Sequence, residues 1–250
     1  ETKTFKVRFA KYYDELTANI DYKKRSEYFN SIINKYKKTD GAVLLDLACG
    51  TGSISVEMAK LGYDVIGIDN SVEMLCIASQ KNYENNLEIQ FICQDMRNID
   101  LYGSVDITIC ALDSINHLNS LKDVKSVFKK VSEFTEPDGL FIFDINTIYK
   151  HKYILANNTF TYETDDVYLV WENQFNEKNN NVKMNLEFFE YEDGAYYRSS
   201  ESFTEKAYDI NEIDAALKET GFEIIAHFDD DTFNPPNEKS QRIVIAARKI

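Results

Sequence analysis

The sequence predicts an α/β fold, in which a doubly wound, seven-stranded, mostly parallel sheet carries an antiparallel β insertion after its fifth strand. Short apolar segments of strand length alternate with segments whose apolar residues recur at helical spacing, which is typical of parallel strands joined by helical crossovers. The strands are apolar almost throughout, as in a sheet covered on both faces. From Phe160 onward the pattern changes to alternating apolar and polar residues, which is typical of antiparallel strands.

The elements of the parallel part follow in regular order. The predicted strands are Val43–Leu47, Asp64–Asp69, Leu87–Ile92, Val105–Ala111 and Leu140–Ile145. Helices are predicted at Ser26–Lys38, at Ser53–Leu61, after the capping residue Ser71, and at Leu121–Thr135, where Pro137-Asp138-Gly139 stops the last one.

The insertion spans Phe160–Thr204 and should contain three or four strands, with hairpin turns at Asn179-Asn180-Asn181 and Glu192-Asp193-Gly194. Asp209 then begins a helix, because Glu212 completes a capping-box pattern. That helix ends at Gly221.

A closing hairpin is predicted from Phe222–Phe228 and Arg242–Arg248. We therefore expect one domain built from residues 1–146 and 207–250, with residues 147–206 inserted between its two parts.

The charge balance disfavours a nucleic-acid partner. The 42 acidic residues outnumber the 28 basic ones, which leaves a net charge of −14, whereas a nucleic-acid binder needs clustered basic residues. The basic segments Lys23–Arg25 and Lys35–Lys38 are expected on the solvated face of the first predicted helix.

No apolar stretch approaches the ~20 residues of a membrane span, and no signal peptide is recognisable.

The four cysteines, Cys49, Cys76, Cys93 and Cys110, form no C-x-x-C pair. Three of them are expected to be buried free thiols, which favours a reducing, cytoplasmic location. The three histidines are widely spaced, so we expect no metal site.

A glycine-rich turn, Asp46-Leu-Ala-Cys-Gly-Thr-Gly52, joins the first strand to the next helix. Ligands of doubly wound sheets bind at such turns, and Asp69 at the end of the second strand is placed to accept hydrogen bonds from ribose hydroxyls. A dinucleotide fingerprint would need a third glycine, where this chain has Ser55. Asp46 would repel a pyrophosphate but attract a cationic sulfonium with an amino group.

The turn resembles the first motif of class I S-adenosylmethionine-dependent methyltransferases, in its D-x-A-C-G-T-G form. The segments Ile68–Leu75, Gln94–Met96 and Val105–Asp113 resemble the later motifs, and Phe9–Asp14 resembles the A-x-x-Y-D segment that precedes the fold in many small-molecule members. The resemblance implies a Rossmann-like methyltransferase fold that binds S-adenosyl-L-methionine and releases S-adenosyl-L-homocysteine.

The resemblance also assigns positions to the cofactor-binding residues. They are Tyr13, Asp46, Ala48, Gly50, Asp69, Asn70, Met74, Asp95, Met96 and Leu112. Asp46 would lie near the amino end of the cofactor, Asp69 at the ribose, and Asp95 at the adenine amine. Structural roles stay open: Asp69 as a helix cap, Met74 as core packing, and Tyr13 as an aromatic staple.

The segment Asp113–Leu118 resembles the S-S-x-x-H-L segment of deoxyaminosugar N,N-dimethyltransferases, except that Asp113 replaces a small hydroxyl residue. His117 and Tyr13 are the predicted catalytic residues, and Asp113, His117 and Trp171 are predicted to bind the substrate. A structural role stays open for both Asp113 and His117.

In related enzymes such an insertion covers the substrate or forms a dimer contact. We expect a lid here, and the wall residues predicted for it are Tyr168, Trp171, Phe188 and Tyr197.

The predicted function is methyl transfer to a small molecule, with an amine as the acceptor, by in-line displacement. O-methylation and a non-catalytic S-adenosylmethionine-binding protein are the alternatives. An RNA or protein acceptor is disfavoured. We expect no nucleic-acid or membrane partner, and a monomer or a homodimer.

Overall fold

The computed structural model describes residues 3–38 and 40–250. Its larger sheet contains β1 (Val43–Leu47), β2 (Asp64–Asp69), β3 (Gln90–Cys93), β4 (Val105–Cys110), β5 (Thr135–Asn146), β10 (Phe222–Asp229) and β11 (Arg242–Lys249). The strand order is β10-β11-β5-β4-β1-β2-β3. Strands β1 to β5 are parallel, and β11 pairs antiparallel with both β5 and β10. The predicted seven-stranded, mostly parallel sheet and its closing hairpin are confirmed.

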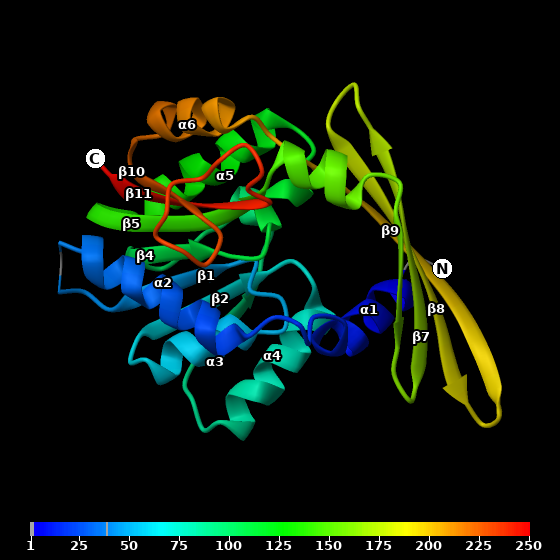
Figure 1. Ribbon diagram of the computed structural model, residues 1–250. Coiled ribbons are helices and arrows are strands. Elements are labelled where there is room, and N and C mark those ends of the chain that lie inside the picture. Colours follow the sequence, from blue (N-terminus) through cyan, green and yellow to red (C-terminus); the bar gives the residue numbers. More distant parts are fainter. Residues whose placement is uncertain (1–2, 39) are drawn as a thin grey trace.

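Helices cover both faces of this sheet (Figure 1). One face carries α2 (Tyr22–Tyr36), α3 (Ser53–Lys60) and α4 (Val72–Glu84), and the other carries α5 (Leu121–Phe134) and α6 (Ile210–Glu219). The caps of α4 and α6 are those predicted: Ser71 accepts the Met74 N–H, and Asp209 and Glu212 form the capping box. Each face buries its own apolar cluster, so the sheet is sandwiched as expected.

Two strands begin several residues away from their predicted starts, for local reasons, and the other strand boundaries agree to within one residue. Strand β5 begins at Thr135 rather than Leu140, because its pairing with β4 starts at Thr135 and shifts register across Pro137. Strand β3 begins at Gln90 rather than Leu87, because the Asn82 side chain hydrogen-bonds to both backbone groups of Ile89.

Arg25 does not belong to a solvated face, so that prediction is wrong. Its side chain is buried and forms ion pairs with Asp144, Asp230 and Asp231. The basic residues that precede it on the helix gave no sign of this, because its partners lie far away in the sequence.

The expectation of three buried cysteines is also wrong. Cys110 in the central strand β4 is buried, and Cys49 is half-buried. Cys76 and Cys93 are exposed, since Cys93 ends β3, which is the edge strand of the sheet.

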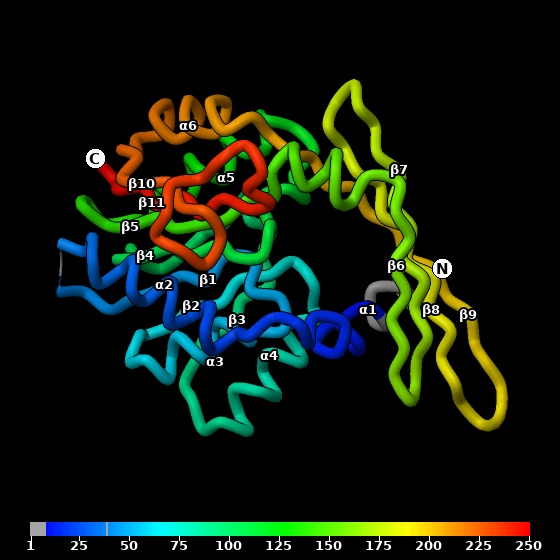
Figure 2. The backbone as a smooth tube through the Cα atoms, viewed as in Figure 1, coloured from blue at the N-terminus to red at the C-terminus, as the bar shows by residue number. Residues whose placement is uncertain are grey.

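The insertion forms a separate four-stranded antiparallel sheet. Its strands are β6 (Thr159–Glu163), β7 (Val167–Asn176), β8 (Asn181–Glu192) and β9 (Ala195–Lys206), in that order. The sheet stands beside the larger one, and α1 (Lys3–Leu16) lies between the two (Figure 2). Ring contacts join α1 to the insertion: Tyr12 stacks on Phe188, and Phe9 contacts Phe203.

Three short helical segments complete the fold: the 3-10 helices η1 (Met96–Asn98) and η2 (Ser114–His117), and the π-helix η3 (Lys150–Leu155) that leads into the insertion. Across the described ranges, no helix combines the length and the apolar character that a membrane crossing requires.

Candidate active site

A cavity of about 330 Å³ lies beyond the carboxyl ends of β1, β2 and β4, where ligands of doubly wound sheets bind. Eight of the ten residues predicted to contact the cofactor line this cavity: Tyr13, Ala48, Gly50, Asp69, Asn70, Met74, Met96 and Leu112. The structure thus brings together residues from the N-terminal segment and from four separate motifs. We call this space the first cavity.

The glycine-rich turn forms the floor of the first cavity. Gly50 and Gly52 have φ angles of +54° and +72°, which favour glycine. A Cβ on Gly52 would lie 2.8 Å from the Ala78 Cβ, so this glycine also allows α4 to pack closely. The Gly50 N–H donates to Asp69 Oδ2 at 2.9 Å, which fixes the turn against β2.

Asp69 sits at the tip of β2 as predicted. Its Oδ1 accepts the Ser71 N–H at 2.8 Å, and its Oδ2 accepts the Gly50 N–H. Each carboxylate oxygen can accept more than one hydrogen bond, and Asp69 lines the first cavity. The structural and ligand-binding roles of Asp69 are therefore compatible.

Asp46 is buried just behind the turn. Ser55 donates to its Oδ2 at 2.5 Å, and Asp46 lines a small cavity together with Tyr13, Ala48 and Leu112. Burial raises the pKa of Asp46 to about 7, although the Ser55 hydrogen bond opposes this shift. Among the described residues, no lysine or arginine forms an ion pair with Asp46, so its carboxylate suits a cationic group of a ligand.

Asp95 is oriented differently from the other predicted residues. Its carboxylate accepts the Arg97 backbone N–H at 2.9 Å and pairs with the Arg97 guanidinium at 2.5 Å. These hydrogen bonds with Arg97 lower the pKa of Asp95. Its neighbours Gln94 and Met96 line the first cavity, whereas Asp95 does not, so its contact with adenine stays a prediction.

Helix α1 places Tyr13 over the cavity. The next residue, Asp14, accepts the Thr51 hydroxyl at 2.7 Å and pairs with Lys81 at 2.6 Å, which ties α1 to the glycine-rich turn and to α4. Tyr13 packs edge-on against Phe9. Burial raises the pKa of the Tyr13 hydroxyl far above its ordinary value, so this group stays neutral.

A second cavity of about 200 Å³ adjoins the first, and the insertion forms one of its walls. The two share Phe9, Tyr13, Leu112, His117 and Phe203. The insertion contributes a mostly apolar wall to the second cavity, formed by Tyr162, Leu169, Trp171, Met184, Leu186 and Phe203.

Of the four predicted wall residues, Trp171 alone lines this second cavity. Side chains alternate along a strand, so Tyr168 lies on the opposite face of β7 from Trp171 and is exposed. Phe188 is on the inner face but packs under Tyr12, and Tyr197 is exposed near the β8–β9 turn. The assignment of Tyr168, Phe188 and Tyr197 to the wall is therefore wrong.

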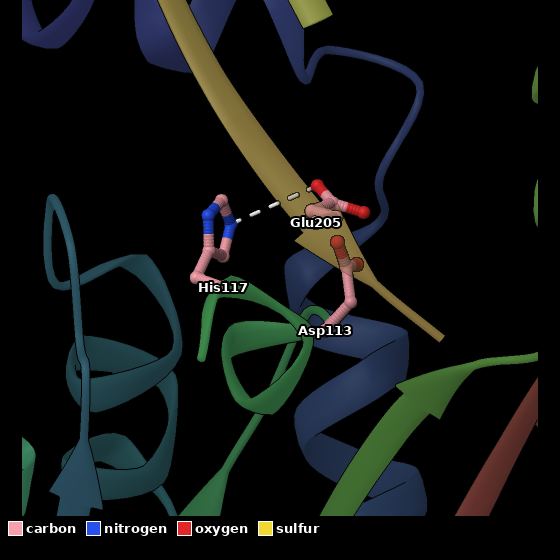
Figure 3. A group of neighbouring side chains, drawn as sticks. All are labelled: Asp113, His117 and Glu205. Carbon is pink, nitrogen blue, oxygen red and sulfur yellow. Dashed lines mark ion pairs between the residues drawn. The ribbon is translucent and has the colours of Figure 1, made fainter. Parts of the chain in front are cut away.

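Asp113, His117 and Glu205 meet at the second cavity (Figure 3). One side-chain atom of each lies within 4.8 Å of the others, and His117 Nε2 is 3.8 Å from Glu205 Oε1. The His117 ring also packs against Phe203, with ring centroids 5.3 Å apart. Glu205 is buried on β9, and no sequence pattern indicated it, because it lies in the insertion, far from every motif.

A buried ionic network supports the loop after β4. Asp144 accepts the backbone N–H groups of Leu112 and Asp113 at 2.8 and 2.7 Å and pairs with Arg25 and Arg242. Burial opposes ionisation of Asp144, but the two guanidinium groups prevail and lower its pKa. Leu112 and Asp113 have φ angles of 57° and 53°, so these hydrogen bonds hold an unfavourable backbone conformation.

Arg242 also pairs with the Asp113 carboxylate at 2.5 Å. Asp113, His117 and Glu205 have the donor types of a metal site, but the guanidinium beside Asp113 adds a positive charge that would oppose binding of a divalent ion. Arg242, which also pairs with Asp144, fixes the position of the Asp113 carboxylate.

The comparisons with known proteins agree with this geometry. Residues 44–139 match a family model described as a methyltransferase domain. The chain is 31% identical over 242 residues to the putative methyltransferase YqeM of Bacillus subtilis (strain 168), and the match covers 96% of each chain.

A solved structure from Clostridium acetobutylicum ATCC 824, described as an S-adenosylmethionine-dependent methyltransferase, superimposes with a TM-score of 0.87. It is 33% identical, and the match covers 97% of this chain and 98% of that one. A glycine/sarcosine N-methyltransferase of Halorhodospira halochloris is 30% identical over 146 residues, which is 57% of this chain and 53% of that protein.

Proposed function

The chain belongs to the class I S-adenosylmethionine-dependent methyltransferases, and from this premise we propose that it methylates the nitrogen of a small-molecule amine. The observation that carries the proposal is the junction of the two cavities. Tyr13, Leu112 and His117 line both of them, so a methyl donor in the first cavity and an acceptor in the second would meet at these residues.

The first cavity suits the methyl donor by charge and by shape. The buried Asp46 is placed for the amino end of S-adenosylmethionine, and Asp69 for its ribose hydroxyls. When bound, S-adenosylmethionine supplies a methyl group that an attacking nitrogen takes up as the methyl–sulfur bond breaks, which leaves S-adenosylhomocysteine.

The second cavity suits an amine. Asp113 and Glu205 are two carboxylates on its wall, and carboxylates stabilise an ammonium group by charge-assisted hydrogen bonds. The relative from Halorhodospira halochloris is named an N-methyltransferase, which supports the same class of acceptor. The aminosugar type of acceptor stays a prediction, because it rests on two short matches, the Asp113–Leu118 segment and the Tyr13-Asp14 pair.

His117 is the proposed base. An ammonium must lose a proton before its nitrogen can attack, and a neutral imidazole at the junction can accept that proton. Glu205, with its Oε1 3.8 Å from His117 Nε2, would then stabilise the imidazolium. Tyr13, as a neutral hydroxyl over the junction, would orient the reacting groups.

The insertion is the proposed lid, since its inner face forms a wall of the second cavity. A cavity of only about 200 Å³ favours a small acceptor over RNA or a protein chain. A monomer or a homodimer, and a cytoplasmic location, remain predictions.

The test is a screen of amines, alcohols and phenols with methyl-labelled S-adenosylmethionine, preceded by calorimetry with S-adenosylmethionine and S-adenosylhomocysteine. We expect both adenosyl compounds to bind and the label to appear on amines. Label on hydroxyl compounds alone would favour O-methylation. Binding of the adenosyl compounds without transfer to any acceptor would favour a non-catalytic role.

A further inference from the structure

The second cavity continues into a third space of about 280 Å³ that lies farther from the first cavity. The residues that the second and third spaces share include Asp113, Trp171, Glu205 and Arg242. Tyr13, Leu112 and His117 line the second space but not the third. The three spaces therefore follow one another, with the methyl-transfer position at one end and the third space at the other.

A lysine side chain lines the far end of this series. Lys150, the first residue of the π-helix η3, borders the third space together with Asn146. Its Nζ donates to Asn146 Oδ1 at 2.8 Å. In the ranges that the structure describes, no carboxylate forms an ion pair with Lys150, so two of its three N–H donors are available to a ligand.

The other cation in this region is already neutralised. Arg242 pairs with Asp113 and Asp144 and lies 3.8 Å from Asp230. Lys150, by contrast, is mostly buried and meets Asp113 and Glu205 only through longer-range attraction. A buried ammonium group without a direct counter-ion is costly, and a ligand anion would offset that cost.

The charges along the series are thus unevenly distributed. The carboxylates of Asp113 and Glu205 line both the second and the third space, whereas the ammonium of Lys150 lines the third space and not the second. A simple amine would leave Lys150 unpaired, and a simple carboxylate without an amine would be repelled by Asp113 and Glu205. A molecule with an amine at one end and a single negative charge at the other satisfies both ends.

We propose that the acceptor is an amino acid in the broad sense: its amine is methylated beside His117, and its carboxylate pairs with Lys150. The proposal rests on the proposed amine methylation and names its substrate class. A carboxylate fits better than a doubly charged phosphate, because a single lysine faces it and two acidic side chains lie nearby.

A tryptophan side chain can report ligand binding at this site by its fluorescence. Trp171 is the single tryptophan of the chain, and it lines both the second and the third space. Its fluorescence therefore reports binding in these spaces without any need for methyl transfer.

The experiment titrates the full chain, saturated with S-adenosylhomocysteine, with β-alanine, 4-aminobutyrate and 6-aminohexanoate. Each acid is compared with its own carboxamide, which keeps the amine and the length but lacks the charge. We expect at least one acid to bind about tenfold more tightly than its carboxamide, as befits one charge-assisted contact.

Lys150→Gln should abolish this preference while carboxamide binding stays as it was, and Lys150→Arg should retain much of it. The matched control is Lys152→Gln, also in η3, which is exposed and pairs with Glu177; it should keep the full preference. Acids that bind no better than their carboxamides, acids that do not bind, or a preference that survives in Lys150→Gln would overturn the proposal.

Two further measurements show whether the proposed amine methylation itself is wrong. Calorimetry with S-adenosylhomocysteine and methyl transfer to the carboxamides test amine methylation without the anion. Transfer to carboxamides with no preference for acids would refute the Lys150 assignment and leave N-methylation standing.

Discussion

Ser55 donates a 2.5 Å hydrogen bond to the carboxylate of Asp46, and both side chains are buried behind the glycine-rich turn. The hydrogen bond orients the carboxylate but does not neutralise it, and burial still raises the pKa of Asp46 to about 7. In the unliganded protein the ionised Asp46 carboxylate therefore lowers the stability of the fold, and a cationic ligand would stabilise it by pairing with this charge.

We predict that Asp46→Asn stabilises the unliganded protein at alkaline pH. The pKa of Asp46 is raised in the folded state, so its favourable contribution is complete below about pH 4 and is lost as the pH rises through about 7. At about pH 8 the substitution should raise the free energy of unfolding by roughly 1–3 kcal/mol, and near pH 4 it should have little effect. Urea denaturation at both pH values measures this.

The matched control for that substitution is Asp64→Asn, since Asp64 is exposed at the start of β2. It should give no pH-dependent gain. An Asp46→Asn protein that is less stable than the wild type at alkaline pH would show that the ionised carboxylate is not a burden on the fold.

Cofactor affinity should respond to Asp46 in the opposite direction. An ionised Asp46 is needed to pair with the amino group of S-adenosylmethionine, so the affinity should fall as the pH drops below about 7. Asp46→Asn should weaken binding at least about tenfold at pH 8 and should remove this pH dependence. Calorimetric titration across the pH range tests it, and an unchanged pH profile in the variant would contradict it.

Asp69→Ala should weaken cofactor binding before it affects transfer. The carboxylate holds the Gly50 and Ser71 N–H groups and faces the first cavity, so its loss removes ribose contacts and loosens the turn. We expect the Kd for S-adenosylhomocysteine to rise about 10- to 100-fold, while turnover at saturating S-adenosylmethionine changes far less. Unchanged affinity would mean that Asp69 serves the turn alone.

The sequence predicted well which side chains line the first cavity, for a physical reason. Gly50, Asp69 and Met74 lie in contiguous strand–turn–helix segments, and the order of parallel strands brings the ends of β1 and β2 to one edge of the sheet. Local spacing therefore determines where those side chains lie. Asp95 shows the limit, because a neighbouring guanidinium, Arg97, takes up its carboxylate.

The acceptor half was predicted poorly, because it depends on contacts between distant segments. Glu205 and Lys150 stand in no motif, and only the docking of the insertion brings them to the second and third spaces. Tyr168 was misplaced because it was grouped with Trp171, although alternation along β7 puts the two side chains on opposite faces. The burial of Arg25 likewise depends on Asp144 and on a loop near the end of the chain.

Asp144→Asn should destabilise the protein strongly. The buried carboxylate pairs with Arg25 and Arg242, and removing its charge leaves two buried guanidinium groups without this partner, at a cost of about 3–5 kcal/mol. Because the pKa of Asp144 is lowered in the folded state, its contribution is present above its ordinary pKa and is lost as the pH falls below it. The difference from wild type, measured by urea denaturation, should therefore be full at neutral pH and shrink in acid.

A surface substitution, Glu177→Gln, is the control, since the exposed Glu177 pairs with Lys152 at the surface and surface pairs contribute little. A loss below about 1 kcal/mol for Asp144→Asn would show that the network is not coupled as its geometry indicates.

His117→Ala should slow transfer about 100-fold, whereas the affinity for S-adenosylhomocysteine should survive, because Asp46 and Asp69 are untouched. Glu205→Gln should slow transfer by a smaller factor, since it acts by stabilising the protonated His117, with 3.8 Å between their nearest atoms. If the two residues act as one unit, the double variant should be scarcely slower than His117→Ala alone. Single-turnover rates with any amine acceptor found in the screen measure all three, and Asp209→Asn, a change at the cap of α6, serves as a distant control. Multiplicative effects in the double variant would separate the roles of His117 and Glu205, and unchanged turnover in His117→Ala would remove it from the catalytic residues.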